Sequence, residues 1–304
     1  MITRVTQQST QRNVLANMQR NLAAMSNLQE QASSGKKIAK ASDDPSRASD
    51  AMSLRSERAA TQQYARNAQD GLSWLNTIDS TLVETSSSLR RARDLVVQGS
   101  NLGAASLQSR EALASELEGI KAALMEQANT QYMGRSVFAG TSDAGNAFDP
   151  TTYAFTGSAG GSVERRTAAD VTVRVDGDGA AIFGSSTDPA DANNANYSVF
   201  QLLDDVANTL RSGGDPSTAL GQLDTRLNAV ITNATSVGAR TNQIESSMTM
   251  AADKAETLRN DISGVEDIDL AQTIMDLKMQ EVGYQSSLNS AARVLQPTLL
   301  DFLR

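Results

Sequence analysis

The sequence predicts a mainly α-helical protein. We expect an elongated antiparallel bundle or coiled coil of long helices, with the N- and C-terminal helices paired and a small β-containing domain inserted in the middle. Apolar residues recur at alternating spacings of three and four along most of the chain, the period of helices with one buried face. Between residues 133 and 199 this period disappears, and Gly, Thr, Asp, Asn and Pro become frequent.

The longest regular pattern lies in the second half of the chain. Thirteen positions keep heptad spacing without a break: Leu220, Leu223, Leu227, Val230, Ala234, Val237, Thr241, Ile244, Met248, Ala251, Ala255, Leu258 and Ile262. Only Thr241 among them is polar. A run of about six heptads exceeds the three or four that indicate a coiled coil, so one long helix is predicted here.

A second long helix is predicted from about Pro45 to Gln98. Asp44 can accept a hydrogen bond from a free amide at the helix start, and Pro45 lacks the amide that would be left unpaired there. A turn is expected between Gly99 and Gly103. A third helix follows, with apolar positions in register at Leu113, Leu117, Ile120 and Leu124.

The middle of the chain predicts short strands. Val171, Val173 and Val175 alternate with polar residues, which is the period of a half-buried strand. The run Asp176-Gly177-Asp178-Gly179 is expected to form a β-turn, and a further strand is expected to end at Ile182-Phe183-Gly184. A calcium loop is disfavoured because Ala181 stands where the turn glycine is required.

Both ends of the chain predict amphipathic helices. Their apolar positions, which we call the terminal seam, are Leu15, Met18, Leu22, Met25, Leu270, Ile274, Leu277, Tyr284, Leu288, Leu295 and Phe302. Residues 1–42 hold six basic and one acidic residue, a net charge of +5, and residues 263–304 hold three basic and six acidic residues, a net charge of −3. Opposite charges favour pairing of the two ends, although exposed ion pairs contribute little.

These patterns predict three domains. Residues 1–42 and 263–304 form a terminal coiled-coil domain, which we expect to be mobile in the free monomer because two such helices bury little apolar surface. Residues 43–134 and 198–262 form a domain of long helices. Residues 135–197 form the inserted, outward-facing domain.

Composition argues against catalysis and nucleic-acid binding. The chain has no His and no Cys, so the most common proton-transfer group and the most common transition-metal ligands are missing. The net charge of −8 is unsuited to binding phosphate backbones. No catalytic constellation, cofactor site or metal site is predicted. The N-terminal residues show no cleavable signal peptide, and no stretch has the length and hydropathy of a membrane span.

Several short segments of the sequence resemble segments of the flagellin family. Residues 27–38, Asn-Leu-Gln-Glu-Gln-Ala-Ser-Ser-Gly-Lys-Lys-Ile, resemble its N-terminal signature in the form used by the hook-associated branch. Residues 66–71, 134–141, 287–291 and 299–303 resemble later family segments. The signature residues carried over are Ser34, Gly35, Asp43, Asp44, Pro45, Arg66, Asn67, Asp70 and Gly71.

The resemblance implies a structural role and not an enzymatic one. It implies a subunit of the bacterial flagellum that forms an adaptor ring joining the hook to the flagellin filament. The implied partners are further copies of the chain, hook-associated protein 1, flagellin and a flagellar export chaperone. An extracellular location, reached by type III export without a cleaved signal, is also implied. A filament flagellin remains an alternative, as does a non-flagellar coiled-coil scaffold.

Overall fold

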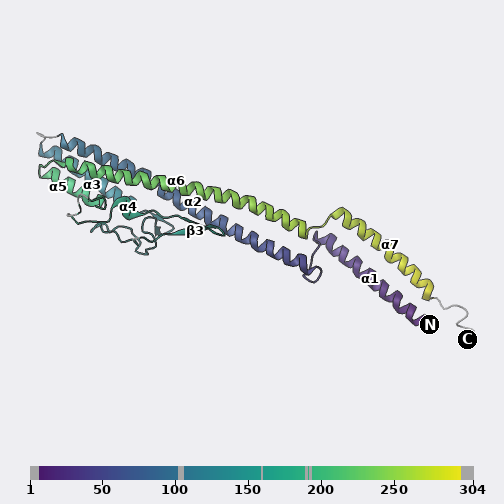
Figure 1. The fold of residues 1–304 in the computed structure, drawn as a ribbon. Coiled ribbons are helices and arrows are strands. Elements are labelled where there is room, and N and C mark those ends of the chain that lie inside the picture. The colour runs from purple at the N-terminus through teal and green to yellow at the C-terminus, as the bar shows by residue number, and fades with distance from the viewer. Residues whose placement is uncertain (1–6, 102–105, 159, 189–190, 192–193, 296–304) are drawn as a thin grey trace, which may run out of the picture. The chain divides into compact units, whose positions relative to one another are not determined.

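The computed structural model describes residues 7–101, 106–158, 160–188, 191 and 194–295, and it is mainly helical (Figure 1). In the chain, long helices precede and follow a middle section with two small antiparallel sheets, so the expected fold class is confirmed. The elements are α1 Gln7–Ser34, α2 Pro45–Ser100, α3 Leu107–Ala128, β1 Gln131–Tyr132, β2 Arg135–Ser136, β3 Glu164–Ala168, β4 Val171–Arg174, α4 Gly179–Phe183, α5 Val199–Arg211, a 3₁₀ turn Pro216–Thr218, α6 Ala219–Glu266 and α7 Leu270–Leu295.

The chain divides into two compact units. Unit 1 comprises residues 1–60 and 254–304, and unit 2 comprises residues 61–253. Helices α2 and α6 contribute residues to both units. They run antiparallel, joined by the Lys254–Glu57 ion pair at 3.0 Å in unit 1 and by the Arg93–Asp224 pair at 2.7 Å in unit 2. The predicted division into three domains stays a prediction.

The helix boundaries follow local chemistry. Helix α2 begins at Pro45 as expected, and the Asp44 carboxylate accepts a hydrogen bond from the Arg47 amide at 3.1 Å. Helix α1 ends before Gly35, whose φ of +70° suits glycine and stops the helix. Helix α7 begins after Asp269, whose carboxylate accepts hydrogen bonds from the amides of Ala271 and Gln272.

The middle of unit 2 differs from the expected pattern in two places. The β-turn expected at residues 176–179 does not form, because the Gly177 and Gly179 amides donate to the Val137 and Phe138 carbonyls instead. Strand β4 confirms the predicted alternation, but the strand expected to end at Ile182-Phe183-Gly184 is wrong, because residues 179–183 form the short helix α4. The Asp178 carboxylate caps this helix by accepting a hydrogen bond from the Ala181 amide at 3.0 Å. The helix then ends at Gly184, whose φ is +82°.

Helix α5 was not predicted and is a large part of the core. Its buried side chains recur at helical spacing and pack against α3. They are Val199, Phe200, Leu202, Leu203, Val206, Ala207 and Leu210.

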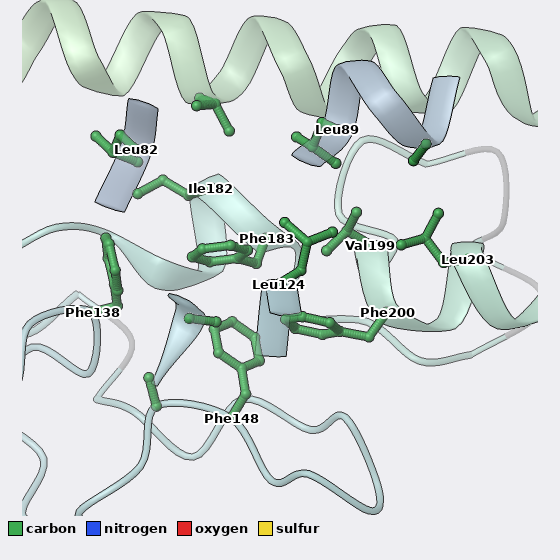
Figure 2. Close-up of a cluster of buried hydrophobic side chains, with 14 of the residues drawn as sticks. Leu82, Leu89, Leu124, Phe138, Phe148, Ile182, Phe183, Val199, Phe200 and Leu203 are labelled. Atoms are coloured by element: carbon green, nitrogen blue, oxygen red, sulfur yellow. The ribbon is translucent and has the colours of Figure 1, made fainter. Parts of the chain in front are cut away.

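The core of unit 2 is centred on four buried phenylalanines (Figure 2). The ring of Phe148 lies 5.7 Å from that of Phe183 and 5.3 Å from that of Phe200, and Phe138 lies 5.5 Å from Phe183. Leucines of α2, α3 and α5 surround these rings. The segment predicted as a separate inserted domain therefore shares one apolar core with the helices of unit 2.

Trp74 packs where α2 meets the middle section. Its side chain is 2% exposed, and its ring lies 5.5 Å from that of Tyr132. The guanidinium of Arg165, from β3, lies 5.5 Å above the indole ring. Trp74 is the single tryptophan of the chain.

Candidate assembly surface and its supporting joint

Helices α1 and α7 of unit 1 pack side by side and antiparallel, which confirms the predicted pairing of the ends (Figure 1). The Gln280 side-chain amide of α7 donates to the Asn21 carbonyl of α1 at 3.2 Å. On α1, apolar side chains such as Val14 and Leu28 are half-buried. The two helices bury little apolar surface against each other, because few of these side chains are fully buried.

The residues of the terminal seam divide between two environments. Met18, Met25, Leu277 and Tyr284 are half-buried. The others whose side chains are described stay exposed: Leu15 58%, Leu22 47%, Leu270 52%, Ile274 46% and Leu288 40%. The side chain of Leu295 and the whole of Phe302 lie outside the described residues. The assembly role predicted for these residues stays a prediction.

A second apolar surface lies on α7 and was not predicted. Met275, Met279 and Val282 are 57%, 69% and 66% exposed. We call these three residues the methionine stripe. Their spacing of four and three places them on one face of the helix, and this spacing is visible in the sequence. Together with the exposed seam residues, the stripe leaves α7 apolar well beyond its contact with α1, which is typical of a helix that is covered by a partner.

Two short segments form a joint between the terminal helices and the long helices of unit 1. The Lys37 amide donates to the Glu266 carbonyl at 2.6 Å, and the Ile268 amide donates to the Gly35 carbonyl at 3.2 Å. Lys36 and Asp267 form an antiparallel bridge between them. Residues 35–37 and 266–268, which we call the joint, are therefore held together by a short backbone ladder.

The carboxylate of Glu266 reinforces the joint. This side chain is 5% exposed, and its Oε2 accepts from Lys36 Nζ at 2.9 Å and from an Arg55 guanidinium nitrogen at 2.7 Å. Burial raises the pKa of the Glu266 carboxyl, but the hydrogen bonds and charges of Lys36 and Arg55 outweigh burial and lower it. The ionised Glu266 carboxylate, at the end of α6, therefore connects the segment after α1 to helix α2.

Replacing Glu266 by glutamine is expected to loosen the joint by about 1–2 kcal/mol, since both cations remain half in water. Hydrogen exchange of the Lys37 and Ile268 amides should become faster. The Glu281→Gln variant removes an exposed carboxylate from the same unit and should leave these amides unchanged. Equal protection of both amides in wild type and E266Q would show that the carboxylate contributes nothing.

Acid should have the same effect as this substitution. Because the folded-state pKa of Glu266 lies below its ordinary value of 4.5, the carboxylate stabilises the joint above that pH. The contribution is lost as the pH falls through the lowered pKa. The exchange of the Lys37 and Ile268 amides in wild type should therefore approach that of E266Q at the acid end of a titration.

The first group of signature residues lies in and beside the joint. Ser34 Oγ accepts from the Lys36 amide at 3.2 Å, and Gly35 supplies a ladder carbonyl. The Asp43 carboxylate accepts from the Lys40 amide at 2.8 Å, which orders the loop before α2. Asp44 and Pro45 start that helix, so this group shapes the chain between α1 and α2.

The second group lies on α2 in unit 2 and fixes the β3–β4 hairpin. The Asn67 side-chain amide donates to the Arg166 carbonyl at 3.0 Å, and Asp70 pairs with Arg165 at 2.7 Å. At Gly71 an added Cβ would come within 3.0 Å of Val175, so glycine permits close packing there. Arg66 donates to the neighbouring Gln63 of its own helix.

The fold and its surface define a structural subunit with paired terminal helices that expose apolar side chains. Comparisons with known proteins show which structural proteins the chain resembles. Residues 5–143 match the bacterial flagellin N-terminal helical region. The resemblance to the flagellin family, and within it to hook-associated protein 3, is confirmed.

Known proteins with similar sequences match most of the length of this chain. The chain is 28% identical over 293 residues to flagellar hook-associated protein 3 of Escherichia coli (strain K12), covering 88% of this chain and 92% of that protein. It is 26% identical to the flagellin of Bacillus subtilis (strain 168), covering 93% of each.

A solved structure of a flagellar hook-associated protein from Vibrio parahaemolyticus has a similar fold, with a TM-score of 0.66 and 21% identity over 74% of this chain and all of that one. The solved structure of hook-associated protein 3 from Legionella pneumophila superposes with a TM-score of 0.60 and 16% identity, covering 70% of this chain and 98% of that one.

Proposed function

We propose that the chain is a structural subunit of the bacterial flagellum that joins the hook to the filament. The observation that carries the proposal is the exposed apolar surface of the paired terminal helices. Isolated exposed leucines are ordinary, but Leu15, Leu22, Leu270, Ile274 and Leu288 recur along two paired helices. The similarity to hook-associated protein 3 over most of the chain supports the same role.

In this proposal, neighbouring copies cover the surface that the monomer leaves exposed. Burying apolar area gains roughly 25 cal/mol per Å², and several half-exposed leucines and methionines on each copy supply such area. A ring of copies would meet hook-associated protein 1 on one side and flagellin on the other. A flagellar export chaperone would shield the apolar C-terminal helix before assembly, and the chain would be exported to the cell exterior.

Deletion of the gene is expected to give cells with hooks but no filaments, and flagellin should accumulate unpolymerised in the medium. The reason is that a filament cannot start where its adaptor is absent. Electron microscopy of the cells and immunoblotting of the medium measure the two results. Normal filaments on the mutant would contradict the proposal, and expression of the gene from a plasmid should restore filaments.

A filament flagellin is the second candidate, favoured by the similarity to the Bacillus subtilis flagellin over 93% of both chains. Copy number separates the two functions. A filament subunit would be the main protein of sheared filaments, whereas a junction subunit would be a minor one. Quantitative mass spectrometry of sheared flagella decides between them.

A further inference from the structure

Unit 1 holds a groove beside the joint that the proposed assembly of the terminal helices does not use. The groove has a volume of about 420 Å³. Small apolar side chains from the loop after α1 and from the first turns of α2 line it, together with Met52, which is 63% exposed. Alanines at positions 39, 41, 48 and 51 leave room for a larger side chain of a partner.

The lining of this groove carries an excess of positive charge. Lys36, Lys40 and Arg55 line it, against the single carboxylate of Glu266. Lys36 and Arg55 share that carboxylate, while Lys40 is 69% exposed and has an ion pair with Glu30 only at 4.0 Å. We call this site the basic groove. Its chemistry suits a partner that offers a long apolar side chain flanked by carboxylates.

Residues 267–282 of the same chain have this chemistry. They contain the methionine stripe, whose flexible side chains can fill an irregular groove. They also hold four acidic residues against one basic residue, a net charge of −3: Asp267, Asp269, Asp276 and Glu281 against Lys278. Glu281 pairs with Lys278, so the other three carboxylates supply the excess negative charge.

We propose that the basic groove of one copy receives the methionine stripe of the next copy. This inference rests on the proposed function, and it specifies which surfaces meet. A ring of copies closes only through a heterologous interface, in which two different patches of each copy contact each other. The basic groove includes the joint residues Lys36 and Glu266, and the methionine stripe begins at Met275, in the second turn of the helix that follows the joint.

Cysteine crosslinking tests this contact directly, because the chain has no cysteine of its own. One copy carries Met52→Cys and one tag, and another carries Met279→Cys and a second tag. Both are made in cells that lack the native gene, and sheared flagella are treated with a short bismaleimide. Both methionines are more than half exposed, so neither variant should disturb folding.

The expected result is a crosslinked dimer that carries both tags. Met250 is a matched control, 60% exposed on α6 in unit 2, and Met250→Cys should give no such dimer with Met279→Cys. Lys40→Glu in the Met52→Cys copy should lower the yield about two- to fivefold, as for an exposed ion pair, and Asp276→Lys in the other copy should restore it.

The failure of this inference differs from the failure of the proposed function. Flagella that contain both tagged copies but yield no dimer with both tags would overturn the proposed contact and leave the junction role intact. Absence of both tagged copies from the flagella, with normal filaments on the cells, would instead contradict the junction role itself.

Discussion

Replacing Leu15 and Leu22 by aspartate is expected to abolish incorporation of the protein into flagella while the monomer keeps its fold. The two side chains are 58% and 47% exposed on α1, so in the monomer the new charges stay in water. In the assembly they would lie against apolar side chains of a neighbour. Burial of an unpaired carboxylate costs several kcal/mol, enough to lower the affinity more than a thousandfold.

Immunoblotting of sheared flagella measures incorporation, and circular dichroism of the purified variant checks the fold. A control variant places aspartates at Val83 and Met250, which are 63% and 60% exposed in unit 2. It should be incorporated normally. Wild-type amounts of the Leu15→Asp, Leu22→Asp variant in flagella would show that this face of α1 is not an interface.

Replacing Phe183 by alanine is expected to have the largest effect on stability, about 3–5 kcal/mol of the free energy of unfolding of unit 2. Phe183 is 1% exposed and contacts the rings of Phe138, Phe148 and Phe200 (Figure 2). The variant leaves a cavity between elements that all belong to one core, so little of the space can be filled by relaxation.

Calorimetry should therefore show the transition of unit 2 at a much lower temperature in F183A. Phe155 gives a matched control, because it is only partly buried and contacts the ring of Phe148 from the edge of the core. Phe155→Ala should lower the transition less. Equal effects of the two substitutions would show that the four-ring cluster is not the centre of the core.

Long-range periodicity and end signals in the sequence predict the long helices well. Asp44 and Pro45 locate the start of α2, because capping acts within one turn and is visible locally. The heptad pattern that begins at Leu220 predicts α6 because its period persists over about six heptads. Helix α5 carries an equally clear spacing from Val199 to Leu210 but is short and follows an irregular segment. The strand expected at Ile182 failed because the Asp178 cap outweighs the β-branched residue there.

The assembly surface is less visible in the sequence. The apolar spacing of the ends identifies Leu15 and Met18 alike, but it cannot show that Met18 is half-buried while Leu15 stays exposed. Glu266 could not be identified as part of the joint, because its partners Lys36 and Arg55 lie 230 and 211 residues away. A contact of that separation leaves no local spacing, and only the folded chain brings the groups together.

Trp74 provides an intrinsic fluorescence probe of folding. Because it is the single tryptophan and lies buried in unit 2, indole emission follows the unfolding of that unit alone. Backbone ellipticity sums the helices of both units. The difference between the two signals in one denaturation experiment therefore reports on unit 1, including the terminal pair α1 and α7, without any added dye. Loss of ellipticity at constant emission would mark the melting of the terminal helices in the free monomer.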